Sequence, residues 1–429
     1  MKDDIKNKIY SLVKEYFSDE TLFQTDRVSV GFPCFDHNEI ISAMDSLLDL
    51  RLSQGPKVQK FEDDFSDYLG MNYGVAVNSG SSANLLAIQA LIRTGRVKPG
   101  SEVILPAATF ATVASPILQC GLIPVFVDID PDTFLMCPKD LESKVTPKTK
   151  AIMPIHLYGQ VCDMTEIMKV AKKHNLRVLE DCAECYLATH KGMMAGTIGD
   201  IGSWSFENSK HLSCGDGGIV ATDDEELGDY LRKLGTQGFK NATARSGKIR
   251  VSKDMFQNPS YTRHSHYGFM YRLPEVAAAV ALAQVEKMEF FISKRQQMGS
   301  LYKEVVQKDG AGIISPQFLP EGDVSSYWAF AAKLIDDSID WVEFRKAHVS
   351  HGGDGIYAAW ALLYKEGSIP EIHEMQKQMG LPLMNVEDGI CPVAEIVQPR
   401  LLQFTTNQNT LEEMEIQAEA LSKTLRQLS

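Results

Sequence analysis

The sequence lacks the features of a secreted, disulfide-bonded or membrane protein. Its eight cysteines, at positions 34, 120, 137, 162, 182, 185, 214 and 391, do not follow the spacing of a disulfide framework. The most apolar helix-like run, residues 276–285, is far shorter than the roughly 20 residues that cross a bilayer. The N-terminus mixes charged with apolar residues and has no signal-peptide core. These absences predict a cytoplasmic protein with no membrane partner.

Basic residues are also too few for a typical nucleic-acid-binding protein. The chain has 43 Lys and Arg against 56 Asp and Glu, a net charge of −13, which disfavours nucleic acid and anionic membranes as partners. The sequence has no internal repeat and no low-complexity tract. A chain of 429 residues with 44% hydrophobic and 23% charged residues is ordinary for a globular protein, and its length exceeds what one small core requires.

What the sequence does contain is a regular alternation of apolar strands and helices. Strands are predicted at 74–77, 102–105, 124–127, 151–154 and 177–180, with helices at 83–92, 111–119, 165–174 and 224–236. This spacing predicts an α/β fold with a large, doubly wound, mostly parallel sheet and active groups at the strand ends. A long helix is expected over 275–295, opened by Pro274. The predicted domains are an N-terminal helical extension (1–54), a large domain (55–290) and a smaller C-terminal α+β domain (291–429).

Four features occur in the order that a site for pyridoxal 5′-phosphate (PLP) requires. Gly80 and Ser81, at the start of a helix, can hold a phosphate group. Phe110 follows a strand and can cover the cofactor ring, and Asp181 ends a strand and can keep the pyridine nitrogen protonated. Lys210 lies between a predicted apolar-aromatic strand that contains Trp204 and Phe206 and a predicted strand at 219–222, and it can carry the aldehyde as an imine. Each residue alone has a plain structural explanation, such as a turn, a core position or a helix cap, so the prediction depends on the ordered set.

Several longer stretches resemble one known family. The segments NSGSSANLLAIQAL, VLEDCAE, GTIGDIGSWSFENSKHLSCGDGG and GFMYRLPEVAAA are similar to those of the DegT/DnrJ/EryC1/StrS sugar aminotransferases, from about residue 55 to 285. The resemblance implies the aspartate-aminotransferase (type I) fold, a PLP-binding large domain and a homodimer with active sites at the subunit interface. By position it implies that Ser81 and Ser205 bind the cofactor phosphate, Phe110 stacks on the ring, Asp181 contacts N1 and Lys210 forms the Schiff base.

The chain departs from the family pattern at two positions. Glu184 stands three residues after Asp181, where family members usually carry Gln or His. A carboxylate there needs a proton or an intervening water beside the cofactor's phenolic oxygen, because two anions in contact repel each other. Met270 replaces the Asn of a G-x-N-x-R turn that reaches the partner subunit's phosphate, which leaves that cross-subunit contact without its usual residue.

The N-terminal part also resembles a dehydratase branch of the family. LLDLRLSQGPKVQKFEDDF is similar to enzymes that remove the 3-hydroxyl from nucleotide-linked 4-keto-6-deoxysugars. That branch carries His at the lysine position, and its iron–sulfur version needs a C-x-C pair, whereas this chain has Lys210 followed by His211 and no such pair. Cys182-x-x-Cys185 is interpreted as local packing, and no metal site is predicted.

We therefore expect a PLP-dependent aminotransferase that moves an amino group from L-glutamate to a keto-sugar. The sugar is expected to be nucleotide-linked and to belong to cell-surface polysaccharide or antibiotic sugar biosynthesis, with the cofactor alternating between PLP and its pyridoxamine form (PMP). The alternatives are the 3-dehydratase and a non-catalytic regulatory member of the fold, which would usually lack the lysine or the aspartate.

The segment 238–266 is long, aromatic and basic, and loops of this length are more often functional than idle. Its basic residues are Lys240, Arg245, Lys248, Arg250, Lys253 and Arg263. We hypothesise that it meets the sugar's phosphate or nucleotide. The sequence does not determine the sugar, the carbon that is aminated or the nucleotide carrier.

Overall fold

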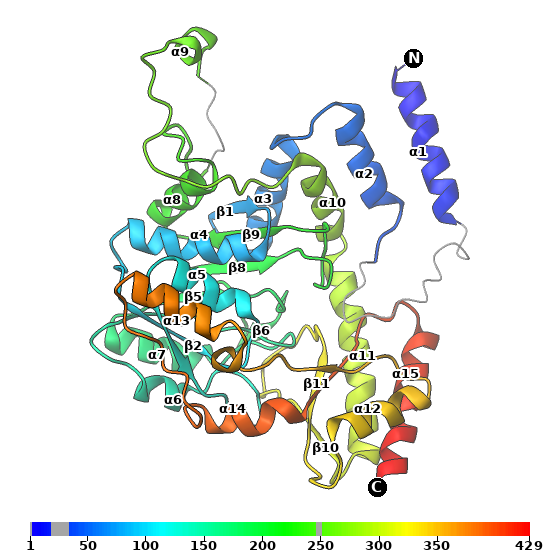
Figure 1. Ribbon diagram of the computed structural model, residues 1–429. Coiled ribbons are helices and arrows are strands. Elements are labelled where there is room, and N and C mark those ends of the chain that lie inside the picture. The colour runs from blue at the N-terminus through cyan, green and yellow to red at the C-terminus, as the bar shows by residue number, and fades with distance from the viewer. Residues whose placement is uncertain (1, 19–33, 246–250) are drawn as a thin grey trace.

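A computed structural model describes residues 2–18, 34–245 and 251–429. Its centre is a seven-stranded sheet in the order β1-β9-β8-β5-β4-β2-β3 (Figure 1). Every adjacent pair from β8 to β3 is parallel, and β9 runs antiparallel to both β1 and β8. The doubly wound, mostly parallel sheet is therefore confirmed. Its strands are β1 (Tyr73–Val77), β2 (Glu102–Pro106), β3 (Ile123–Val127), β4 (Thr149–Ile152), β5 (Arg177–Asp181), β8 (Ile201–Ser205) and β9 (Gly218–Thr222).

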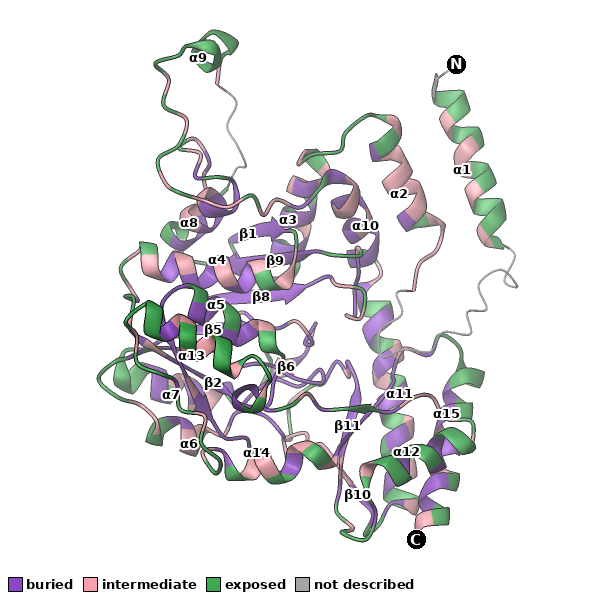
Figure 2. Cartoon of the chain, viewed as in Figure 1, coloured by how far each residue is buried: buried purple, intermediate pink, exposed green. Residues whose placement is uncertain are grey.

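Helices cover both faces of this sheet, and β1, β8 and β9 are buried along their whole length (Figure 2). Complete burial explains why these strands contain only apolar and small residues and no charged ones. The helices around the sheet are α3 (Pro56–Leu69), α4 (Gly80–Arg93), α5 (Ala114–Gln119) after the 3₁₀ turn η2 (Ala111–Val113), α6 (Pro138–Ser143), α7 (Met164–His174), α8 (Glu225–Gly235) and α10 (Glu275–Val285). A short hairpin, β6 (Thr189–His190) and β7 (Met193–Met194), follows β5.

A second sheet in the C-terminal part has the order β10-β11-β13-β12. Its strands are β10 (Ile314–Pro316), β11 (Phe330–Leu334), β12 (Tyr357–Ala358) and β13 (Leu401–Phe404). Strands β10, β11 and β13 share a separate core with α11 (Met288–Asp309), α12 (Trp341–Ser350) and α15 (Leu411–Leu428), whereas both residues of β12 are exposed. The segment between β12 and β13 instead contributes to the core of the large sheet; it contains η3 (Leu363–Lys365), α13 (Ile369–Gln378), α14 (Pro392–Val397) and η4 (Gln398–Arg400). The division into domains at residues 54 and 290 stays a prediction.

The single helix expected over 275–295 was wrong. The chain forms two helices, α10 and α11, which meet at Glu286 and Lys287. The Lys287 ammonium lies 3.3 Å from Asp36 and also pairs with Glu39, whose side chain is buried. Alanine-rich α10 packs between α2 (His37–Leu48) and α3, whereas α11 leads to the second sheet. Lys287 thus ties the junction of the two helices to the start of α2, a contact that the apolar pattern of the sequence does not record.

Two segments stand away from the body in Figure 1. The N-terminal helix α1 (Lys2–Ser18) is joined to α2 by Lys6, which pairs with Asp45 and Asp49. The described residues of the segment 238–266, namely 238–245 and 251–266, which we call the arm, project beside α8 and include α9 (Lys253–Gln257). None of the helices in the described parts of the chain combines the length and apolar composition that a bilayer-spanning segment requires.

Candidate active site

A cavity of about 490 Å³ opens at the carboxyl ends of the large sheet's central strands. Every site residue predicted from the sequence lines it: Gly80, Ser81, Phe110, Asp181, Glu184, Ser205 and Lys210. The wall is completed by β12 and by aromatic residues of the C-terminal part, including Trp328 and Trp360. Residues from both sheets therefore enclose the space in which chemistry would occur.

The start of α4 forms one side of the cavity. Ser79 caps the helix by accepting a hydrogen bond from the backbone N–H of Ser82, at 3.1 Å. Gly80 lies so close to β8 that a Cβ atom on it would stand 2.7 Å from the Cβ of Ser205. Glycine therefore permits the helix to begin against the strand. Ser81 lies in the first turn and Ser205 beside it, so the positive end of the helix dipole and the remaining N–H groups of that turn suit an anion between them.

Asp181 lies at the end of β5 and is held by two hydrogen bonds. Asn84 donates from Nδ2 to Oδ2 of Asp181 at 2.7 Å, and the Ala183 N–H donates to Oδ1 at 2.9 Å. Ser203 in turn donates its hydroxyl to Oδ1 of Asn84 at 2.6 Å. All three side chains are buried. The carboxylate is thus fixed in one orientation at the base of the cavity.

Lys210 extends into the cavity toward Glu184. Its Nζ lies 3.3 Å from Oε1 of Glu184 and 4.8 Å from the centre of the Trp328 ring. The other oxygen of Glu184 accepts the Tyr158 backbone N–H at 3.2 Å. Burial raises the pKa of Glu184, and the Lys210 charge opposes that rise in part. This carboxyl group therefore takes up a proton more readily than a solvated glutamate does.

Aromatic side chains form the mouth of the cavity. Phe110 is 49% exposed and meets Trp360 edge-on at 5.4 Å between ring centres. Trp360 lies 6.3 Å from Trp328, whose indole N–H donates to the Ser209 carbonyl at 2.8 Å. An aromatic wall of this kind suits a flat ring or the apolar face of a sugar.

Sequence reasoning missed three of these residues. Asn84 follows Gly80 by four positions, so helical spacing places it on the same face of α4, and that spacing was a usable signal. Trp328 and Trp360 lie far from the motif-bearing stretches, and no local pattern distinguishes them from core aromatics.

The arm and Met270 do not reach this cavity. Within the described residues of the arm, basic groups are used locally: Lys240 donates to the Thr262 hydroxyl at 3.3 Å, and Arg263 to the Phe256 carbonyl at 2.7 Å. Lys248 and Arg250, also predicted to meet the sugar, lie outside the described residues. Met270 is 54% exposed and does not line the cavity.

The paired cysteines do not point to a metal. Cys182 and Cys185 are fully buried, which agrees with local packing. No group of three or more His, Cys, Asp or Glu side chains suited to a metal ion occurs in the parts of the chain that the structure describes.

Comparisons with known proteins point in one direction. The model of the DegT/DnrJ/EryC1/StrS aminotransferase family matches residues 34–348. GDP-perosamine synthase from Caulobacter vibrioides is 35% identical over 311 residues, which are 72% of this chain and 77% of that protein. An aminotransferase structure from Psychrobacter cryohalolentis superposes with a TM-score of 0.80 at 26% identity, covering 91% of this chain and 97% of the other. A GDP-4-keto-6-deoxymannose-3-dehydratase with a trapped PLP–glutamate geminal diamine matches at a TM-score of 0.77 and 27% identity, over 92% of this chain and 100% of that one.

Proposed function

Because the chain belongs to the DegT/DnrJ/EryC1/StrS aminotransferase family, we propose that it transfers the amino group of L-glutamate to a nucleotide-linked keto-sugar. The family and its relatives make it a PLP-dependent sugar aminotransferase of polysaccharide or antibiotic sugar biosynthesis. The amino donor, the nucleotide carrier and the roles of individual residues are the proposal. The observation that carries it is the placement of Lys210 beside Glu184 in one cavity with Asp181 and the start of α4.

The residues of the cavity fit PLP. The start of α4, with Ser81 and Ser205, would hold the phosphate, and the buried carboxylate of Asp181 would meet the ring nitrogen. Thr109 lines the cavity, and its buried hydroxyl has no hydrogen-bond partner among the described residues, so it has a donor to offer to a bound anion. When bound, the cofactor supplies an aldehyde that condenses with primary amines and a ring that accepts electrons.

The proton transfers would fall to Lys210 and Glu184. Among the described residues that line the cavity, Lys210 carries the only primary amine. We assign its Nζ to hold the cofactor and, when released, to move a proton from the α-carbon of the donor. Glu184, 3.3 Å from Nζ, would hold a proton at Oε1 while the lysine is neutral. Trp328 covers the lysine and limits the access of water.

The proposed substrates are anions, and the cavity wall that one chain builds is also rich in carboxylates, which would repel them. Besides Asp181 and Glu184 it includes Glu207 and Asp216, and Lys210 is the sole Lys or Arg among its described residues. A site for glutamate and a nucleotide sugar needs further cations. We propose that a second copy of the chain supplies them through its basic arm, so that the enzyme acts as a homodimer with shared sites.

The runner-up is a 3-dehydratase of nucleotide-linked 4-keto-6-deoxysugars. The match to the GDP-4-keto-6-deoxymannose-3-dehydratase structure favours it, as does the acidic residue at Glu184. Lys210 speaks against it, because the dehydratase branch carries histidine there. A regulatory, non-catalytic role has weaker support, since both Lys210 and Asp181 are present and lie in one cavity.

The absorbance spectrum of the purified, PLP-loaded protein tests the proposal. We expect a visible band that L-glutamate bleaches with release of 2-oxoglutarate, and we expect Lys210→Ala to lose both the band and the turnover. Subsequent addition of a nucleotide-linked 4-keto-6-deoxysugar should restore the band and yield an amino-sugar. A bleached cofactor that releases a dehydrated sugar would establish the dehydratase instead. A protein that does not bind PLP would overturn the site assignment.

A further inference from the structure

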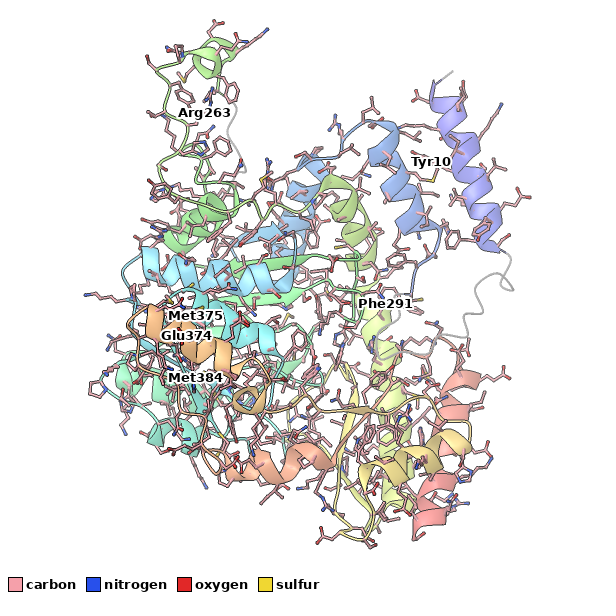
Figure 3. All side chains as sticks on the ribbon, in the orientation of Figure 1. Tyr10, Arg263, Phe291, Glu374, Met375 and Met384 are labelled. Carbon is pink, nitrogen blue, oxygen red and sulfur yellow. The ribbon has the colours of Figure 1, made fainter. Side chains whose placement is uncertain are left out.

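A second, smaller cavity of about 120 Å³ lies behind the active-site lysine. It is bounded by the residue after Lys210, by the first turns of α11 and by the segment that follows β13. Phe291, which lines it, is labelled in Figure 3 at the end of α11 that meets α10. Its lining residues are Cys34, His211, Phe290, Phe291, Lys294, Arg295, Thr406, Asn407, Gln408 and Asn409. None of these residues lines the first cavity.

Arg295 is a buried cation that has no carboxylate partner in the described parts of the chain. The residue is 4% exposed, and its Nη1 donates to the Trp328 carbonyl at 3.0 Å and to the Thr406 hydroxyl at 2.9 Å. Within the described residues it forms no ion pair, and burial alone lowers its pKa to about 10. The guanidinium is therefore still charged at neutral pH. A buried, unpaired charge is costly unless an anion accompanies it.

The rest of the wall also favours an anion. Lys294 contributes a second cation, and none of the described residues that line the cavity is Asp or Glu. Asp354 is a carboxylate near this wall, but it does not line the cavity. It accepts hydrogen bonds from the Gln408 amide at 3.0 Å and from the Thr405 hydroxyl at 2.8 Å. Among the described residues that line the cavity, the positive charges of Arg295 and Lys294 therefore have no carboxylate beside them.

Two residues of this wall, His211 and Gln408, each carry a buried lone pair that has no donor among the described residues. His211 is 5% exposed, and its Nε2 lies 3.1 Å from the Ser326 carbonyl, so Nε2 carries the hydrogen and Nδ1 the lone pair. Within the described residues, neither Nδ1 of His211 nor Oε1 of Gln408 has a hydrogen-bond partner. Burial and the nearby Arg295 charge hold the pKa of His211 well below its ordinary value, which keeps the ring neutral. A ligand that completes the site must present hydrogens as well as negative oxygens.

We propose that this cavity binds inorganic hydrogen phosphate. Its charged oxygens would accept hydrogen bonds from Arg295 and Lys294, and its O–H group would donate to Nδ1 of His211. Sulfate has similar size and charge but carries no hydrogen at neutral pH, so it would leave the His211 lone pair unpaired. Water could satisfy the lone pair but not the charge of Arg295. The site is separate from the anion site at the start of α4.

Binding to the PLP-saturated protein tests the proposal, because the phosphate site at α4 is then filled. Isothermal titration with phosphate and, separately, with sulfate at matched ionic strength and neutral pH should show one phosphate per chain. Sulfate should bind about tenfold more weakly or worse, since a polar group left unpaired penalises the wrong ligand. Lys294→Gln should weaken phosphate binding several-fold, and Arg295→Met should abolish it.

Lys308→Gln is the matched control, because Lys308 is an exposed lysine near the other end of α11 and does not line the cavity. It should bind phosphate as the unchanged protein does. If Arg295→Met fails to fold, two measurements still test the proposal. They are the comparison of Lys294→Gln with Lys308→Gln and the preference for phosphate over sulfate. The proposal is overturned by absence of saturable phosphate binding, by equal affinity for sulfate, or by equal behaviour of the two lysine variants.

Discussion

Asp181 has its orientation set by a residue 97 positions earlier in the chain. Asn84 donates to the carboxylate and accepts from Ser203, so one amide links α4, β5 and β8 at the base of the cavity. A buried carboxylate with fewer donors is less well stabilised as an anion. The proposed contact between Asp181 and the pyridine nitrogen therefore depends on Asn84 as a positioning residue.

Replacing Asn84 with Ala should weaken PLP binding at least about tenfold, since a lost hydrogen bond to a charged group typically costs about 1.5–3 kcal/mol. A titration of the apo-protein with PLP, followed by absorbance, measures the change. Gln89→Ala on the same helix is the control, because Gln89 does not line the cavity, and it should bind PLP normally. Unchanged PLP affinity in Asn84→Ala would remove the positioning role.

A pH effect on stability is expected from His348, which is 1% exposed in the core of the second sheet, where its ring meets Phe404. Burial lowers its pKa to about 4. Because the folded-state pKa lies below the unfolded-state value, the unfolded chain binds the extra proton, and stability falls as the pH drops between the two values. The loss from pH 7 to pH 5 should be about 2 kcal/mol from this group.

Urea unfolding of the unchanged protein and of His348→Leu, followed at both pH values, measures that loss. The variant should lose about 2 kcal/mol less on acidification. His373→Leu, which changes a less buried histidine in another helix, α13, should lose as much as the unchanged protein. Parallel pH dependence in all three proteins would show that His348 does not carry the effect.

At the scale of elements, the start of α4 is the feature on which the proposed phosphate site depends. Its cap, its first turn and its contact with β8 all lie within residues 79–82. The sequence predicted a turn and a helix here, although the helix begins at Gly80 and not at residue 83. The position of the first turn against β8 determines where the free N–H groups point.

Gly80→Ala should impair both folding and cofactor binding. Helix propensity alone would favour alanine, so any loss must come from the new Cβ, which would stand 2.7 Å from the Ser205 Cβ. Overpacking of this kind costs about 1–3 kcal/mol. Thermal unfolding and PLP titration measure the two effects. Gly355→Ala, where the added Cβ would meet no atom within 4 Å, is the control, and equal results for the two variants would contradict the clash.

At the scale of the whole molecule, the acidic active-site wall and the projecting basic arm are complementary but separate within one chain. The arm stands away from the body beside α8 (Figure 1), and none of its described residues lines the cavity. A two-fold dimer would allow the arm of each chain to serve the site of the other. Opposite charges would then guide both assembly and substrate.

Mixing two inactive variants tests the shared site. One chain carries Lys210→Ala, and the other carries Lys240→Ala and Arg263→Ala in the arm. Mixed dimers would contain one site with an intact lysine and an intact partner arm, so about a quarter of the original activity should return after co-refolding. The same mixture made with Lys308→Gln in place of the arm variant controls for subunit exchange. Absence of recovery, with exchange shown by mass, would contradict a shared site.

The sequence by itself determined the α/β class, the order of the strands along the chain and the set of candidate residues from Gly80 to Lys210. Those signals are local: an apolar run, a small-residue turn and a helix start lie next to one another, and strand ends in a parallel sheet share one edge. Only the tertiary structure decided that Asn84 orients Asp181, that Trp328 and Trp360 close the cavity, and that the helix of 275–295 is broken at Lys287. The second cavity likewise joins residues 34, 211, 295 and 406. Such contacts depend on how distant segments pack, and their local patterns are those of ordinary core or surface residues.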